Sequence, residues 1–379
     1  MSGGMELYLH MPFCVRKCAY CDFLSFPSGA KTQRMYAKRL MEDIGVMGKR
    51  YGEIPVETIF IGGGTPSVPD SGLIVEIMEH VRHAFHVADG AEISMEANPG
   101  TVTREKLTDY RKAGINRLSF GLQSANDREL KLLGRIHTWA EFLESFTLAR
   151  ECGFANLNID LMSALPGQTC ESWKETLSRV TNLDPEHISA YSLIIEEGTP
   201  FGERYGSEEG RKLLPDEDSE REMYHETKRF LKDCGYERYE ISNYAKPGRE
   251  CRHNIGYWTG VPYLGLGLGA SSYLDGCRFT VNPDMKQYLE EKPGMFADIE
   301  KLTKKDMEEE FFYVGLRMTA GVSLSEFERR FGISAKEVYP GLMETFVKEK
   351  AAHFEGDRFV LTDYGLDVSN YIMAQFLQD

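Results

Sequence analysis

The order of strand-like and helix-like segments predicts an α/β protein whose main domain is a partial (β/α)6 barrel. Between residues 6 and 193, short apolar stretches alternate with amphipathic stretches over short links. This alternation favours a parallel sheet with helices packed on its outside. Six such units by about residue 195 are too few for an eight-fold barrel, which typically takes about 250 residues. A doubly wound open sheet is the alternative fold.

Each unit of the barrel rests on its own pattern. Residues 56–61 (VETIFI) are mostly apolar, as expected of a buried strand, and residues 33–51 repeat apolar side chains at helical spacing. The expected strands are residues 6–10, 56–61, 92–96, 117–120, 156–161 and 187–193. The expected helices are residues 33–51, 73–86, 104–113, 127–133, 140–152 and 171–182.

The remaining chain divides into an extension and a C-terminal domain. Residues 196–215 are rich in glycine, proline and charge, which predicts an exposed connection before a helix over 218–234 and a strand over 238–242. Glycines at every second position within residues 263–272 indicate backbone that approaches another group closely. Three helices (307–318, 325–331 and 335–347), a hairpin over 353–361 and a last helix resemble a winged-helix module. The expected domains are therefore residues 1–195, 196–300 and 301–379.

Composition excludes several classes of protein. A net charge of -15 argues against a nucleic-acid binder, which needs a basic face to displace counterions from phosphates. No window of 18 or more apolar residues occurs, and the first residues (MSGGME) lack the pattern of a signal peptide. We therefore expect no membrane span and a cytoplasmic location. Five of the eight cysteines are scattered singly, which indicates buried thiols rather than a disulfide framework.

The other three cysteines, Cys14, Cys18 and Cys21, lie together at C-x3-C-x2-C spacing. Thiolate sulfur is the ligand that iron clusters select, so the segment predicts an iron-sulfur site. Three thiolates leave one iron of a 4Fe-4S cube without a protein ligand, and an open metal position is where chemistry takes place. A zinc site would need a second pair at similar spacing, which is missing, and a disulfide is the remaining alternative.

This spacing, with Tyr20 before Cys21, resembles the radical S-adenosylmethionine (SAM) superfamily, in which SAM binds the open iron. Further segments narrow the resemblance to the oxygen-independent coproporphyrinogen III oxidase group: LYLHMPFC at residues 7–14, GGGTP at 62–66 and the residues after the next three strands. Bare glycine backbone suits the amino-acid end of a ligand, a carboxylate suits ribose hydroxyls and an arginine suits a carboxylate. Taken singly, these residues are ordinary turns and surface charges. The resemblance implies SAM contacts from Tyr8, Gly63, Gly64, Thr65, Glu96, Gln123, Arg135 and Asp160.

Two departures separate the chain from those oxidases. Phe23 stands where they carry a further cysteine, and the 13 residues before Cys14 are too few for their N-terminal extension. With the H-N-x-x-Y-W motif, the chain resembles the HemW-type haem chaperones instead. That resemblance implies haem as cargo with contacts from His253, Tyr257 and Trp258. Imidazole can be an axial ligand of haem iron, and the aromatic rings offer flat apolar faces. The alternative is that His253 and Asn254 cap a helix and Trp258 is core.

Three functions follow from these patterns. The leading one is a haem chaperone that passes haem to an acceptor protein, with an electron donor required if SAM is cleaved. The second is a radical SAM enzyme acting on a tetrapyrrole, such as the anaerobic decarboxylation of coproporphyrinogen III. The third is a structural iron-sulfur protein without SAM. No catalytic residue is assigned, and Cys251, Arg249 and Arg252 are expected near haem or its propionates.

Overall fold

The computed structural model describes residues 3–378, so Met1, Ser2 and Asp379 of the expected outer domains lie outside it. One twelve-stranded sheet dominates, in the order β14-β13-β12-β11-β1-β4-β5-β6-β7-β8-β10-β9. Six of its strands are parallel and follow one another in chain order. This sequential order confirms the partial barrel, because a doubly wound sheet reverses its strand order. The six strands are β1 (Met5–Met11), β4 (Val56–Gly63), β5 (Val87–Ala97), β6 (Arg117–Gln123), β7 (Leu157–Ser163) and β8 (His187–Ser192).

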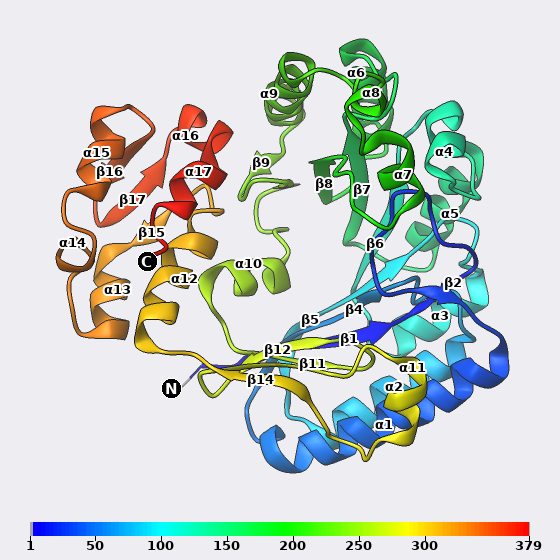
Figure 1. Cartoon of the computed structure of the whole chain (residues 1–379). Coiled ribbons are helices and arrows are strands. Elements are labelled where there is room, and N and C mark those ends of the chain that lie inside the picture. The colour runs from blue at the N-terminus through cyan, green and yellow to red at the C-terminus, as the bar shows by residue number, and fades with distance from the viewer. Residues whose placement is uncertain (1–2, 379) are drawn as a thin grey trace.

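Helices cover the outer face of this curved sheet (Figure 1). Each turns an apolar face toward the strands, as Leu40, Ile44 and Met47 do in the first helix. Thr138 and Thr169 begin two of the helices with capping boxes, which satisfy backbone amides that the helix itself leaves unpaired. The outer helices are α1 (Ala30–Tyr51), α2 (Ser71–Ala84), α3 (Arg104–Lys112), α4 (Asp127–Leu133), α5 (Trp139–Glu151) and α6 (Cys170–Thr181).

Alternation along the strands gives the barrel a polar interior. In β1, Leu7 and Leu9 belong to the apolar core, whereas Glu6, Tyr8 and His10 occupy the alternate positions. Neighbouring strands place polar residues beside this second set, since Glu6 is in register with Thr58. The inward-facing side chains therefore form buried polar layers between the amino and carboxyl ends of the strands.

Later parts of the chain extend both edges of the sheet. β11 (Tyr263–Leu266) pairs in parallel with β1, and β12 (Ser271–Leu274), β13 (Cys277–Thr280) and β14 (Ala297–Lys301) continue antiparallel. Beyond β8 lie β10 (Asn243–Ala245) and β9 (Glu237–Arg238), two short strands where one strand over 238–242 was expected.

The glycine run does approach another group closely. Gly267 has a φ of +97°, and a Cβ there would collide with the hydroxyl of Tyr36. That hydroxyl donates to the His10 carbonyl at 2.6 Å and accepts from the Leu268 amide at 3.0 Å. A glycine is needed at this position because the tyrosine occupies the space of a side chain.

Residues 196–215 are not the exposed connection that the sequence predicts. They form α7 (Pro200–Tyr205) and α8 (Glu208–Arg211), and α9 (Glu217–Asp233) follows. Phe201 and Tyr205 are buried in a small apolar cluster with Leu133, Met162 and Leu165. The aromatic side chains at i and i+4 share one helix face, and their burial outweighs the polar composition around them.

A C-terminal module with its own aromatic core faces the open side of the sheet (Figure 1). Its core stacks Phe312 on Phe376 with ring centroids 4.3 Å apart. The helix expected over 335–347 is two helices, because the chain turns at Pro340 and at Gly341, which has a φ of +77°. The module comprises α12 (Lys304–Gly315), β15 (Val322–Ser323), α13 (Leu324–Phe331), α14 (Ala335–Val338), α15 (Leu342–Lys348), β16 (Ala352–Glu355), β17 (Arg358–Leu361), α16 (Asp363–Asp367) and α17 (Ser369–Ala374).

Four small elements complete the fold. β2 (Phe13–Cys14) pairs with β3 (Phe26–Pro27), and α11 (Met285–Glu290) packs near α1. The helix α10 (Arg252–Thr259) lies between the sheet and the C-terminal module (Figure 1). Across residues 3–378, no helix combines the length and apolar character needed to cross a membrane.

Candidate functional site

The cysteine loop lies at the carboxyl ends of the strands, where β1 runs into β2. Its backbone is fastened to two neighbouring elements: the Ala19 amide donates to the Leu133 carbonyl at 3.0 Å, and the Ala19 carbonyl accepts from the Phe201 amide at 2.9 Å. Arg16 also donates to the Gly134 carbonyl at 2.6 Å. The loop is thus held between the end of α4 and the start of α7.

The three thiols of this loop are half-buried and form no disulfide. Burial raises the pKa of Cys21, and the nearby Cys18 and Cys14 raise it further. In the described part of the chain, no three histidine, cysteine, aspartate or glutamate side chains are already arranged to hold a metal ion. The donor chemistry suits an iron-sulfur cluster, because three thiols share one short loop. Cluster binding stays a prediction for these three residues.

A hydrogen-bonded chain joins two of the cysteines to the rim of the barrel. Thr65 Oγ1 lies 3.6 Å from Cys14 Sγ and accepts from Asn98 Nδ2 at 2.7 Å. Arg135 donates to Asn98 Oδ1 at 2.6 Å and to Cys18 Sγ at 3.5 Å. The Arg135 Nε is buried without a hydrogen-bond partner in the structure. A buried donor without a partner is costly, so this guanidinium is suited to an anionic ligand.

Asn98 is a member of this chain that was not predicted as a site residue. Its side chain connects Thr65 with Arg135, and its backbone amide donates to Ser67 Oγ at 3.2 Å. The available signal was its position immediately after the strand that ends at Ala97, just before Pro99. Side chains that follow parallel strands meet at one edge of a sheet.

The glycine segment packs directly against the end of β1. The Gly64 amide donates to the Met11 carbonyl at 2.8 Å, and a Cβ on Gly64 would collide with the backbone of Phe13. Gly63 has a φ of +113°, and its amide donates to Glu96 Oε2 at 3.1 Å. The segment therefore has to be glycine, and it brings bare backbone to the cysteine loop.

Two half-buried carboxyl groups lie below this rim. Burial and the nearby Asp160 raise the pKa of Glu96 to about 8, so its carboxyl holds a proton at neutral pH. Burial also raises the pKa of Asp160, although hydrogen bonds from Ser119 at 3.1 Å and Asn158 at 2.7 Å oppose that shift.

The last two of the predicted SAM contacts lie beside these carboxyl groups. Burial and the charge of Glu96 raise the pKa of Tyr8, whose hydroxyl lies 3.0 Å from His10 Nδ1. Gln123, at a bulge with a φ of +76°, accepts from the Tyr191 hydroxyl at 3.0 Å. Tyr191 is in turn close enough to Asp160 and Arg135 for their charges to shift its pKa. Of the eight predicted SAM contacts, Thr65 and Arg135 contact the thiols of the cysteine loop, and the other six lie on the barrel strands or the segments that follow them.

The H-N-x-x-Y-W motif lies elsewhere, on α10 near the amino ends of the strands. His253 is 1% exposed, with Nδ1 2.6 Å from Thr58 Oγ1 and Nε2 2.9 Å from the Tyr257 hydroxyl. Burial lowers the pKa of His253 to about 3, so the ring is neutral. Trp258 is half-buried under the guanidinium of Arg317, whose Cζ lies 4.4 Å from the centre of the ring. His253 is bonded within the fold, whereas Trp258 Nε1 is buried without a hydrogen-bond partner, and a haem contact from the motif residues stays a prediction.

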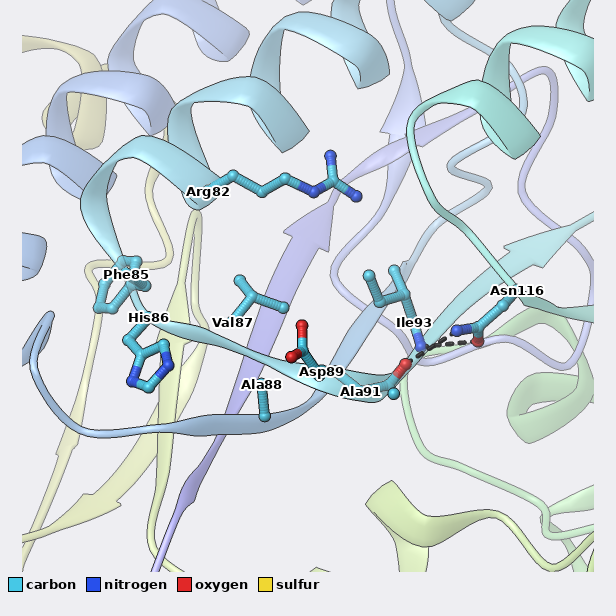
Figure 2. A pocket seen from close by; sticks show the side chains of 10 residues that line it. Arg82, Phe85, His86, Val87, Ala88, Asp89, Ala91, Ile93 and Asn116 are labelled. Atoms are coloured by element: carbon cyan, nitrogen blue, oxygen red, sulfur yellow. Dashed lines mark hydrogen bonds between the residues drawn. The ribbon is translucent and has the colours of Figure 1, made fainter.

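Two surface hollows lie at this same end of the barrel. One, of about 590 Å³, lies between the end of α2 and the start of β5, with Arg82 and His86 on its wall (Figure 2). The other, of about 530 Å³, lies beside α10 and is lined partly by Arg111, Arg249 and Arg252. Strand starts and strand ends lie at opposite edges of a parallel sheet, so neither hollow belongs to the cysteine site.

Comparison with known proteins places this geometry in a family. The Radical SAM superfamily profile matches residues 8–180, and the HemN C-terminal domain profile matches residues 302–368. A Bacillus subtilis (strain 168) protein named Heme chaperone HemW is 35% identical over 374 residues, which is 98% of each chain. The chain belongs to the HemW family. An Escherichia coli (strain K12) member is 34% identical over 382 residues, covering 99% of this chain and 98% of its own.

One solved structure shares the fold of this chain over its whole length. Coproporphyrinogen III oxidase (HemN) from Escherichia coli, a radical SAM enzyme, superposes with a TM-score of 0.85 and 23% sequence identity. The match covers 100% of this chain and 91% of that one, so both the barrel and the C-terminal module are common to the two proteins. Membership of the radical SAM superfamily implies a 4Fe-4S cluster and SAM.

Proposed function

We propose that this chain is a cytoplasmic haem chaperone, which binds haem and transfers it to an acceptor protein. The observation that carries this proposal is its similarity to proteins named Heme chaperone HemW over 98% of its length. That similarity spans the cysteine loop, the H-N-x-x-Y-W helix and the C-terminal module together. The partners are haem, an acceptor protein and, if SAM is cleaved, an electron donor.

In this proposal the mouth of the barrel, at the carboxyl ends of the strands, holds the cofactors. Cys14, Cys18 and Cys21 bind the 4Fe-4S cluster, which with SAM supplies one-electron chemistry when bound. Arg135 is held by Asn98 and the Gly121 carbonyl, and its unpaired Nε would be available to a carboxylate such as that of SAM. The remaining SAM contacts are Tyr8, Gly63, Gly64, Thr65, Glu96, Gln123 and Asp160.

The amino end of the barrel is the proposed haem region. The hollow of about 530 Å³ places three guanidinium groups, Arg111, Arg249 and Arg252, beside Ile255 of α10. Guanidinium groups pair well with carboxylates, so these arginines suit the two propionates of haem. Tyr257 and Trp258 lie on the same helix outside the wall of this hollow, and their rings are the aromatic surface proposed for the porphyrin.

The second candidate function is oxidation of coproporphyrinogen III. The fold shared with the HemN oxidase supports it, since the two structures have a TM-score of 0.85. Phe23, whose side chain is 68% exposed on the cysteine loop, weighs against it. A phenylalanine cannot supply the further thiol that the resemblance to those oxidases implies at this position. The chaperone function is therefore favoured.

The test is a haem titration of the full chain after anaerobic cluster reconstitution, followed by Soret absorbance. We expect saturable binding, weakened about tenfold when Arg249→Ala and Arg252→Ala are combined, because each removes a charge partner of the propionates. Arg34→Ala, an exposed arginine on α1, is the matched control and should leave binding unchanged. Absence of binding at micromolar haem with an intact cluster, together with turnover of coproporphyrinogen, would establish the second function instead.

A further inference from the structure

The helix α10 is fastened into the amino end of the barrel by Glu92 of β5. One carboxylate oxygen accepts from the Arg252 amide at 3.1 Å, and the other accepts from the His253 amide at 3.3 Å and from Cys251 Sγ at 3.5 Å. Glu92 is 8% exposed. A carboxylate at the first amides of a helix caps its start and interacts favourably with its dipole. The helix is therefore positioned by a tertiary contact rather than by a cap from its own sequence.

The imidazole of His253 locks the same helix to β4. Thr58 on that strand bonds Nδ1 and Tyr257 one turn along bonds Nε2, while Phe60 stacks on the ring with centroids 5.3 Å apart. An axial haem ligand needs an imidazole nitrogen that is exposed and has a free lone pair. Neither nitrogen of His253 meets that condition, since both are bonded and the residue is 1% exposed.

Glu6 closes the pocket around this histidine. Its Oε2 lies 3.8 Å from His253 Nδ1, and a Cβ on Gly256 would collide with the Glu6 carboxyl group. The glycine inside the H-N-I-G-Y-W segment is therefore required for α10 to lie against β1.

The other end of α10 is held by the C-terminal module. Arg330 of α13 donates to the Thr259 carbonyl at 3.1 Å, and the guanidinium of Arg317 covers the ring of Trp258. The motif thus contacts the barrel through its histidine and the module through its tryptophan. A shift in the position of α10 would therefore change contacts with both the barrel and the C-terminal module.

We propose that His253 is a positioning residue, which fixes α10 between the barrel and the C-terminal module and does not coordinate haem iron. The proposal rests on the proposed haem function for its ligand, but the seating of α10 is measurable without haem. In this proposal the hydrogen bonds that join His253 to Thr58 and to Tyr257 together hold α10 in place. Loss of any of the three should have the same consequence.

The experiment compares His253→Gln, Thr58→Val and Tyr257→Phe in the full-length reconstituted protein. The readouts are hydrogen exchange of residues 252–259, haem affinity, and the Soret position and electron paramagnetic resonance of bound ferric haem. We expect all three variants to speed exchange of α10 about fivefold or more and to weaken haem binding by a similar factor of roughly 3 to 10. The spectra of bound haem should match those of the unaltered protein. His353→Gln, at an exposed histidine of β16, is the control.

Two outcomes separate this inference from the proposed function. A spectral change of the axial ligand in His253→Gln alone, with Thr58→Val and Tyr257→Phe unaffected, would show that His253 ligates the iron and overturn the inference. If no variant binds haem and neither does the unaltered protein, the chaperone function fails. Hydrogen exchange then still decides the positioning role, because unchanged protection of α10 in Thr58→Val and Tyr257→Phe would refute it. These two variants each change a single polar group, so they keep the test intact if His253→Gln fails to fold.

Discussion

The barrel has polar side chains at both ends. At the carboxyl ends of the strands (the mouth, with Cys14, Cys18 and Arg135) and at the amino ends (the floor, with Glu6, Glu92 and His253), these groups differ in how fully they are hydrogen-bonded. At the mouth, the contacts of Cys14 and Cys18 are long, 3.6 Å and 3.5 Å, and one nitrogen of Arg135 has no partner. At the floor, His253 is bonded on both sides at 2.6 Å and 2.9 Å, although Glu6 Oε2 and Trp258 Nε1 nearby are buried without a hydrogen-bond partner. Groups left with spare bonding capacity are suited to ligands, whereas groups that satisfy one another hold the structure together.

This difference separates two motifs that look alike in the sequence. Both combine polar and aromatic residues of kinds that bind cofactors. The spacing of the cysteines matches the chemistry of a cluster, and the loop presents them at the rim. The histidine motif is enclosed by β1, β4 and β5, so its composition alone does not indicate a ligand.

The largest expected effect is at the mouth. Replacing Cys14, Cys18 and Cys21 together by serine should abolish iron binding and the visible absorbance of the cluster, because hydroxyls are poor ligands for iron-sulfur clusters. The far-ultraviolet circular dichroism should be retained, since the barrel core does not depend on these thiols. Cys152→Ser at the end of α5 is the control and should keep full iron content. If the triple variant still bound a cluster, these three cysteines would not be its ligands.

The next effect is at the floor. Glu92→Ala should lower the free energy of unfolding by about 3 kcal/mol, because it leaves two backbone amides and a thiol of the α10 start without their acceptor. Urea unfolding measures this change. Glu57→Ala removes an exposed carboxylate that pairs with Arg252, and it should cost less than about 0.5 kcal/mol. Equal midpoints for the two variants would show that the floor does not depend on Glu92.

The floor should also give a pH dependence of stability. Burial raises the folded-state pKa of Glu6 from 4.5 to about 9, so the folded protein keeps a proton that the unfolded chain releases. The stability contributed by this proton is complete below pH 4.5 and is lost as the pH rises toward 9.

Glu6→Gln tests this pH dependence, because an amide does not titrate. Relative to the variant, the unaltered protein should lose about 4 kcal/mol of unfolding free energy between about pH 5 and pH 8. Other titrating groups are common to both proteins, so the difference between the two urea-unfolding curves isolates Glu6. Parallel curves would mean that Glu6 is ionised in the folded state.

The smallest effect is again at the mouth. Arg135→Lys should weaken SAM binding about tenfold, because an ammonium cannot keep the contacts to Asn98 and Gly121 while presenting a further donor. Titration calorimetry of the reconstituted protein measures this affinity. Arg128→Lys, at an exposed position of α4, should leave it unchanged. An unaltered affinity in Arg135→Lys would show that the unpaired nitrogen faces something other than SAM.

The sequence was most informative where local patterns decide the structure. Alternating apolar segments were enough to predict the six barrel strands, because each strand needs only its own residues and a helix to cover it. The rim residues were predictable for a related reason, since they follow strand ends. The break at Pro340 was visible too, because proline cannot continue a helix, but it was overlooked.

The contacts of α10 had no comparable local signal. Thr58 and His253 are brought together only by the complete fold, and neither residue type indicates the other. The prediction of an exposed connection over residues 196–215 was wrong for a different reason. The polar composition of the segment concealed Phe201 and Tyr205, whose spacing places both on one helix face. Composition reports the average of a segment, whereas burial depends on the few side chains that face the core.

The pairing of β11 with β1 has a consequence for synthesis of the chain. β1 lies inside the sheet, but one of its edges is covered by Tyr263–Leu266, which leave the ribosome only after most of the chain. Until then the nascent barrel exposes a strand edge with unpaired backbone groups, which can recruit strands of other chains. A contact between residues so distant in the chain also slows folding. β1 is therefore among the last strands of the barrel to be fully paired, and the partly synthesised chain is the state in which this protein is most exposed to aggregation.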